Sequence, residues 1–229
     1  NAPPEEMWGD QYWYKSGINP TIRADLKDIV ENVEGMVFLK DGDIVLDTGC
    51  NDGTMLSYYD NQNLEIIGFE PSKNVADEAI KKGHKVIRDF FNKETFKSRF
   101  GNKKAKVITS ISMFYDLEDP NKFLEDINEC LDDDGLFVIQ QNYLVKMLEN
   151  NGLDNICHEH REYYSFRSLK NLIERHNMEI FDVILNGING GSIRTYIRKR
   201  GGRIFAPKGS VERIWEIGEK EFSLGLDTP

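Results

Sequence analysis

The chain has little of what cross-linking, membrane insertion or nucleic-acid binding requires. It holds three cysteines in 229 residues, Cys50, Cys130 and Cys157, with no closely spaced pair. That spacing fits neither a disulfide framework nor a structural zinc site, so we expect no metal and a reducing, cytoplasmic location. No apolar run approaches the ~20 residues that cross a bilayer, and the start of the chain lacks a signal peptide's basic and apolar segments. We therefore expect no membrane association.

Positive charge is also scarce. The chain carries 29 Lys and Arg against 39 Asp and Glu, a net charge of −10 at pH 7. Such a balance supplies no field that attracts phosphate backbones, so we predict a small-molecule substrate and no nucleic acid. The hydrophobic share of 39%, with 13 Phe and 9 Tyr, is typical of a globular protein rather than a disordered, collagenous or coiled-coil chain.

Apolar segments follow one another in β-then-α order. After Asn19, one face of the chain is apolar at helical spacing, which predicts a helix ahead of the sheet. Short apolar runs predict strands at residues 43–47, 65–70, 85–87, 105–110 and 136–140. Helices are predicted between them, from about Gly53 and at 74–82, 93–99 and 120–131. Repeated units of this kind predict a parallel sheet with helices on both faces.

The β-then-α order changes in the last third of the chain. Residues 166–176 predict a helix, and 178–185 and 192–198 predict two antiparallel strands joined by a glycine-rich turn. By analogy of fold, this order predicts a Rossmann-like α/β class I methyltransferase, a seven-stranded, mostly parallel sheet with an antiparallel last strand. We divide the chain into an aromatic arm (1–20), this domain (21–200), and a linker with a helix at 211–222 that has no obvious packing partner (201–229). The start at Asn1 and the stop at 227–229 suggest a piece of a longer protein.

The turn after the first strand is the most informative segment. Gly49 and Gly53 permit a tight turn and a close approach by a ligand. The spacing is not GxGxxG, and Asp47 and Asp52 surround the turn with negative charge. Phosphates would be repelled there, whereas the sulfonium and amino-acid end of S-adenosylmethionine would be attracted. Glu70 ends the second strand, where doubly wound folds bind ribose hydroxyls.

These positions define the expected S-adenosylmethionine site. Its residues are Asp47, Gly49, Cys50, Asn51, Gly53, Glu70, Pro71, Asp89, Phe90 and Ser112. Asp89 and Phe90 follow the third strand, beside the expected adenine ring. Simple core packing remains an equal alternative for this last pair.

Four motifs resemble the nucleotide-sugar C-methyltransferases of deoxysugar biosynthesis. They are Tyr-Trp-Tyr-Lys-Ser at 12–16, Gly-Cys-Asn-Asp-Gly at 49–53, the segment 154–165 with its His-Glu-His, and Asn-Gly-Gly-Ser-Ile-Arg at 189–194. The resemblance covers residues 12–199. In the family, an N-terminal zinc module and a C-terminal α/β domain flank the S-adenosylmethionine domain, and neither flank lies in the matching segment.

The resemblance implies proton removal from a carbon beside a ketone. The family's base corresponds to His160 and its partner to Glu159, a combination suited to proton transfer near neutral pH. Tyr14 and Tyr115 complete the expected catalytic group, and Tyr12, Asn142 and Arg194 the expected substrate contacts. The chain departs from the family pattern at Cys157, usually Tyr, and at Tyr115, usually His. Tyr115 is a poorer base near pH 7 but can donate a hydrogen bond to an enolate.

Other interpretations stay open at this stage. His158 and His160, with Glu159 or Glu162, are also compatible with metal ligation. The same segment is compatible with a structural role that only closes the mouth of the pocket. Arg194 suits either a substrate phosphate or carboxylate, or a surface acid. An O-methyltransferase, or a cofactor-binding module without catalysis, is compatible with the same residues.

Overall fold

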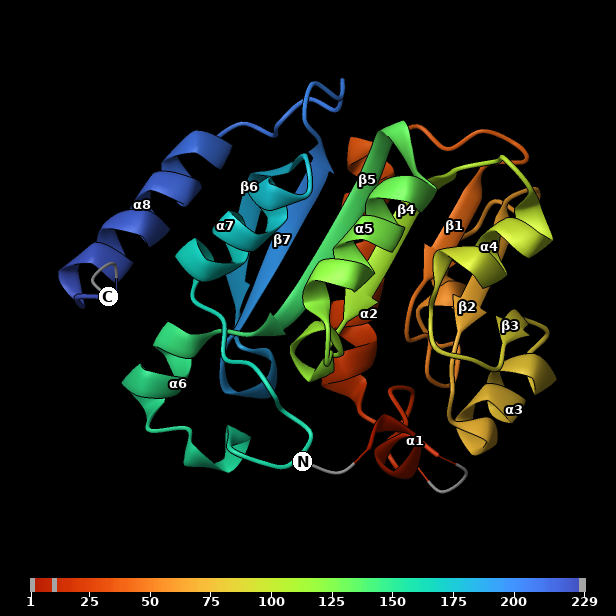
Figure 1. Cartoon of the computed structure of the whole chain (residues 1–229), viewed down its shortest axis with the longest axis horizontal. Coiled ribbons are helices and arrows are strands. Elements are labelled where there is room, and N and C mark those ends of the chain that lie inside the picture. Colours follow the sequence, from red (N-terminus) through yellow and green to blue (C-terminus); the bar gives the residue numbers. More distant parts are fainter. Residues whose placement is uncertain (1–2, 10–11, 227–229) are drawn as a thin grey trace.

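The computed structural model describes residues 3–9 and 12–226. The expectation that the chain is a piece of a longer protein rests on Asn1 and on residues 227–229. These residues lie outside the part of the chain that the structure describes. One seven-stranded sheet, in the order β3-β2-β1-β4-β5-β7-β6, runs through the centre, and helices cover both of its faces (Figure 1). This is the Rossmann-like α/β architecture predicted from the order of the segments.

The strands lie close to their predicted bounds except β5, which begins at Leu131 and not at residue 136. They are β1 (Ile44–Asp47), β2 (Glu65–Phe69), β3 (Lys85–Ile87), β4 (Ala105–Ile111), β5 (Leu131–Asn142), β6 (Met178–Asn186) and β7 (Ser192–Lys199). The first five are parallel, whereas β7 is inserted antiparallel between β5 and β6. The predicted sheet with its antiparallel hairpin is thereby confirmed.

The helices pack two apolar cores against the sheet. They are α1 (Pro4–Met7), α2 (Pro20–Met36), α3 (Lys73–Lys81), α4 (Lys93–Phe100), α5 (Pro120–Cys130), α6 (Leu144–Asn150), α7 (Phe166–Arg175) and α8 (Ser210–Ser223). Ile44 and Leu46 of β1 face the core under α4, α5 and α7, while Val45 faces α2. This alternation is the two-residue period of a strand buried on both faces.

The prediction of a helix from about Gly53 is wrong. Only a short 3₁₀ turn, η1 (Leu56–Tyr58), follows β1. Asn51 adopts a left-handed conformation at φ 50°, and the Thr54 hydroxyl donates a hydrogen bond to Asp52 over 2.6 Å. These local bonds compete with a helical ladder, so the turn has irregular backbone instead of a helix N-terminus.

The expectation that the last helix has nothing to pack on is also wrong. The buried carboxylate of Glu221 in α8 accepts hydrogen bonds from the backbone N–H groups of Phe166 and Arg167, at the start of α7. It also accepts one from the Tyr143 hydroxyl over 2.8 Å. A carboxylate at a helix N-terminus satisfies unpaired donors and complements the helix dipole, so α8 is fixed to the domain.

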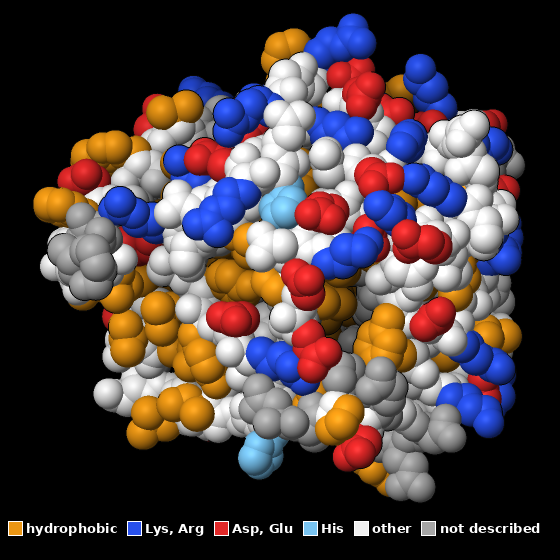
Figure 2. Space-filling view, in the orientation of Figure 1, with side chains coloured by type: hydrophobic (Ala, Val, Ile, Leu, Met, Phe, Trp, Pro, Cys, Tyr) orange, Lys and Arg blue, Asp and Glu red, His pale blue; other side chains and the backbone are white. Residues whose placement is uncertain are grey.

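The visible surface mixes both signs of charge. Acidic and basic side chains are interspersed over the face shown in Figure 2. Two of the ion pairs between α4 and α5 are Lys97–Glu129 and Lys93–Glu129. Within the described residues, no helix is long and apolar enough to cross a bilayer.

Candidate active site

A cavity of about 490 Å³ opens where the carboxyl ends of β1, β2 and β4 meet. Ligands of open α/β sheets bind at this edge, where strand ends and their loops converge. The N-terminal arm contributes Trp8, Tyr12 and Tyr14 to its wall, and α2 contributes Asp25. Residues far apart in the sequence therefore enclose one site.

The turn after β1 is tied to the end of β2. The backbone N–H of Cys50 donates to the Phe69 carbonyl over 2.9 Å, and that of Asn51 donates to Glu70 Oε2 over 2.9 Å. Glu70 Oε1 accepts from the Ser72 N–H over 2.8 Å. Each Glu70 oxygen retains a second lone pair, so the carboxylate is fixed and still able to accept from a ligand hydroxyl.

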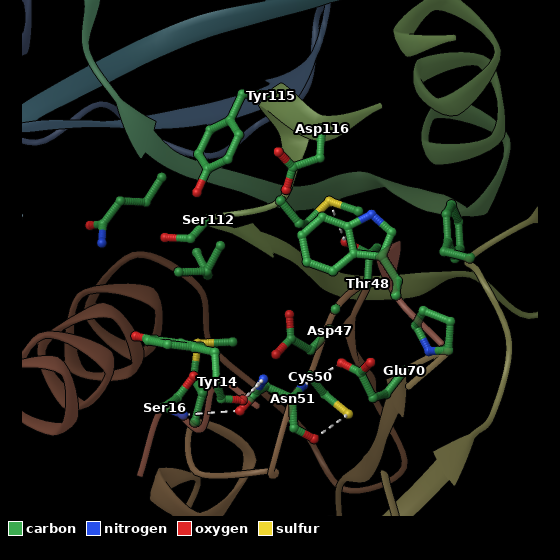
Figure 3. Close-up of a pocket in the computed structure, with 18 of the residues that line it drawn as sticks. Tyr14, Ser16, Asp47, Thr48, Cys50, Asn51, Glu70, Ser112, Tyr115 and Asp116 are labelled. Carbon is green, nitrogen blue, oxygen red and sulfur yellow. Dashed lines mark hydrogen bonds between the residues drawn. The ribbon is translucent and has the colours of Figure 1, made fainter. Parts of the chain in front are cut away.

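Asn51 also joins the turn to the N-terminal arm. Its side-chain oxygen accepts from the Ser16 N–H over 3.0 Å, and its side-chain nitrogen donates to the Tyr14 carbonyl over 3.0 Å. Further along, the Ser72 hydroxyl donates to the Trp8 carbonyl over 2.9 Å. These bonds position the arm against the cavity, with Tyr14, Ser16, Asn51 and Glu70 drawn together in Figure 3.

Buried acids dominate the electrostatics of the floor. Asp47 is 3% exposed and its Oδ1 accepts from the Thr109 hydroxyl over 2.9 Å. Burial raises the pKa of Asp47 to about 7, and burial also raises the pKa of Glu70. Among the described residues that line the cavity there is no Lys or Arg. The floor thus favours a cationic ligand with hydroxyl groups and disfavours a phosphate.

A second polar group lies across the cavity. Ser112, Tyr115 and Asp116 follow β4, and Figure 3 shows them on the opposite side from Asp47 and Glu70. The Tyr115 ring packs 4.4 Å, centroid to centroid, from the ring of His160. The His-Glu-His segment is therefore adjacent to this second group.

Most of the predicted site residues do meet here. Those that line the cavity are Asp47, Gly49, Cys50, Asn51, Glu70, Pro71, Phe90, Ser112, Tyr12, Tyr14 and Tyr115. Sequence reasoning missed Trp8, Asp25, Asp116 and Gln140, which line it too. Trp8 belongs to the aromatic arm. Asp25 lies beside the apolar face of α2, so helical spacing is the one sequence signal for it.

Two expected cofactor residues lie outside the lining. Gly53 has φ +74°, and a Cβ there would come within 2.6 Å of the His84 ring and 3.0 Å of the Ala79 Cβ. The glycine therefore serves the contact between the turn and α3. Asp89 is exposed and its Oδ1 accepts from the N–H of Phe90 over 2.8 Å, so it shapes its own loop.

Arg194 is buried and does not line the cavity. Its guanidinium, 1% exposed, binds Asp25 Oδ1 over 2.8 Å and Asp28 Oδ2 over 2.7 Å, and its Nε donates to Gln140 Oε1 over 2.7 Å. It thereby fixes two side chains of the cavity wall, Asp25 and Gln140. Of the two roles left open for Arg194, the structure shows pairing with acids, namely Asp25 in the cavity wall and the exposed Asp28.

Asn142 and the His-Glu-His residues lie near the site but outside its lining. The Asn142 side chain donates to the Asn155 side chain. His160 Nδ1 lies 2.8 Å from the Asn155 carbonyl, so that carbonyl, and not Glu159, is the partner of its ring. Glu159 is exposed. Burial raises the pKa of Asp116 and of Tyr12, and the negative charge of Glu159 adds to both increases.

The described residues of the His-Glu-His segment, 158–160, are not arranged as metal ligands. His158 is exposed, and within the described parts of the chain no group of three or more His, Cys, Asp or Glu side chains is arranged to hold an ion.

Comparison with known proteins gives one family and one curated relative. The family described as "Methyltransferase domain" matches residues 21–183. C-methyltransferase NovU of Streptomyces niveus is 31% identical over 193 residues, which cover 83% of this chain and 45% of that protein. The chain thus spans less than half the length of this curated relative.

Several solved structures share the fold. The plantazolicin methyltransferase BpumL, in complex with S-adenosylhomocysteine, aligns over 80% of this chain and 86% of its own with a TM-score of 0.60 at 16% identity. The mycolic acid cyclopropane synthase CmaA1, also with S-adenosylhomocysteine, aligns over 86% and 91% with a TM-score of 0.60 at 13% identity. A methyltransferase from Aquifex aeolicus aligns over 78% and 93% with a TM-score of 0.56 at 18% identity.

Proposed function

The chain belongs to the methyltransferase domain family, and from that premise we propose that it methylates a carbon beside the ketone of a nucleotide-linked deoxysugar. It is an S-adenosylmethionine-dependent methyltransferase with the class I fold. Methyl transfer to a carbon atom is supported by the C-methyltransferase relative and by the four motifs that resemble those of the nucleotide-sugar enzymes. The single observation that carries the proposal is the packing of His160 against Tyr115 at the wall of the cavity.

The floor of the cavity fits the cofactor. Asp47 and Glu70 are buried carboxyl groups without a basic partner in the lining, and they complement a positive charge and ribose hydroxyls. Gly49 leaves room beside the turn, since a Cβ there would already lie 3.3 Å from Met113. When bound, S-adenosylmethionine supplies an electrophilic methyl group on a sulfonium.

His160 is suited to the role of base. Its Nδ1 faces the Asn155 carbonyl, which can only accept, so Nδ1 carries the proton and Nε2 carries the lone pair. The same carbonyl stabilises the imidazolium that forms when Nε2 takes a proton. We assign to His160 Nε2 the removal of the substrate proton.

The acidic cavity limits which part of the substrate can enter it. Because no described lining residue is basic, the diphosphate of a nucleotide sugar would lie outside the cavity, and the sugar alone would enter. The three free cysteines fit a reducing, cytoplasmic location. The role in carbohydrate biosynthesis follows from the proposed sugar substrate.

One experiment tests the proposal. The protein is incubated with methyl-labelled S-adenosylmethionine and a panel of nucleotide-linked keto-sugars and their reduced alcohols, and products are located by NMR. We expect labelled carbon beside the ketone and no transfer to the alcohols. His160→Ala should lower turnover by about 10²–10⁴-fold with cofactor affinity retained, whereas the exposed neighbour His158→Ala should retain activity. Transfer to oxygen, or full turnover by His160→Ala, would contradict the proposal.

A further inference from the structure

Asp116 combines burial with an unused carboxyl oxygen. It ends the 3₁₀ turn η2 (Phe114–Asp116) after β4, is 9% exposed and lines the cavity. Its Oδ1 is buried and has no hydrogen-bond partner among the described residues. A buried polar atom left in this state lowers stability, so a native protein that retains one often uses it.

The backbone holds Asp116 at the wall of the cavity. Ser112 leaves β4 at φ 54°, a left-handed conformation that costs a non-glycine residue energy, and its N–H donates to the Gln140 carbonyl over 2.8 Å. The Asp116 N–H donates to the Met113 carbonyl over 3.0 Å. Figure 3 shows Asp116 beside Tyr115, across the cavity from Asp47.

Burial and the nearest negative charge oppose the ionisation of Asp116. Burial and the negative charge of Glu159 raise its pKa to about 8, against a smaller opposing effect of Arg161. Arg161 also binds Glu118 over 2.8 Å. The two other titratable groups that face it, Tyr12 and Tyr115, have pKa values raised well above their usual range by burial, so both are neutral at pH 7.

We propose that Asp116, in its protonated form, is a catalytic residue that donates a hydrogen bond to the ketone oxygen of the substrate. This inference rests on the proposed function. As His160 Nε2 takes the proton, the C–H electron pair becomes the new C=C bond and the carbonyl π pair moves to oxygen, where the Asp116 O–H stabilises it. The enolate carbon then forms its bond to the methyl group, and the carbon–sulfur electron pair returns to sulfur.

A neutral carboxylic acid suits this position for a physical reason. A hydrogen bond to a developing negative charge strengthens in a site of low dielectric constant, and a donor fixed beforehand needs no reorganisation. Loss of one such donor costs on the order of 10²–10³ in kcat. A carboxylate at the same place would instead repel the enolate.

The test compares Asp116→Ala, Asp116→Asn and, as a control, Glu125→Gln, an exposed acid on α5. Turnover is measured from pH 6 to 10 with the keto-sugar that the wild-type protein methylates, and circular dichroism checks the fold. We expect Asp116→Ala to lower kcat by about 10²–10³ at pH 7 with unchanged cofactor affinity. Wild-type kcat should fall as pH rises through the Asp116 pKa, because the active form is protonated. Asp116→Asn should keep part of kcat and lack this alkaline limb.

A second measurement separates the role of Asp116 from the proposed function. With S-adenosylhomocysteine in place of the donor, NMR follows exchange of the substrate's proton with D₂O, and Asp116→Ala should slow this exchange as much as it slows turnover. Turnover of Asp116→Ala within threefold of wild type, or an alkaline limb that persists in Asp116→Asn, overturns the role of Asp116 alone. A wild-type protein that methylates no ketone overturns the proposed function, and this inference with it.

Discussion

At the scale of single residues, buried carboxyl groups set the chemistry of the cavity. Asp47 and Glu70 were predicted because each ends a buried strand, and strand ends converge at one edge of a parallel sheet. Asp116 was not predicted, because nothing in the acidic stretch 116–119 marks one of its acids as buried. The carbonyl of the adjacent Tyr115 accepts hydrogen bonds from the N–H groups of Arg161 and Glu162, a long-range contact that no local pattern reveals. The end of a strand can therefore be predicted from the sequence. The protonation state of a side chain cannot, because it depends on the residues that surround it in the folded protein.

Gly49 supports a prediction at this scale. Gly49→Val should lower the affinity for S-adenosylmethionine by about tenfold or more, because the added methyl groups meet Met113 or enter the cavity. Gly35→Val, in α2 with nothing within 4 Å of a new Cβ, is the matched control and should bind normally. Calorimetry measures both. Equal affinities of the two variants would show that the turn does not contact the cofactor.

At the scale of elements, the β-then-α order could be predicted because each strand is a short apolar run between turn residues. The length of β5, which begins at Leu131, could not, since Asp132, Asp133 and Asp134 are typical of a solvated turn. Likewise α8 lacked a visible partner because its anchor, Glu221, is a buried acid and not an apolar residue. Long-range polar contacts of this kind leave no periodic signal.

The contact between β7 and α2 yields a prediction about stability. Arg194→Met leaves Asp25 buried without its cation and should lower the free energy of unfolding by about 3–5 kcal/mol. Lys27→Met removes an exposed pair with Glu31 on the same helix and should cost less than about 1 kcal/mol. Urea denaturation measures both. Adding Asp25→Asn to Arg194→Met should restore part of the loss, and no recovery would argue against an uncompensated Asp25 charge.

At the scale of the whole molecule, one site is assembled from segments that are distant in the sequence. The arm before α2, the ends of β1, β2 and β4, and the residues after β4 all meet at the cavity. The family match begins at residue 21, so it leaves out the aromatic arm that lines the site. The chain also covers 45% of its curated relative.

The acidic cavity at the end of β1 is expected to hold the methyl donor. A crystal structure of the protein with S-adenosylhomocysteine tests this site. We expect the amino-acid end of the ligand beside Gly49 and Asp47, the ribose hydroxyls on Glu70, and the sulfur facing the side of the cavity that carries Tyr115 and Asp116. A structure with the ligand bound elsewhere, or with Glu70 turned away from the ribose, would contradict it.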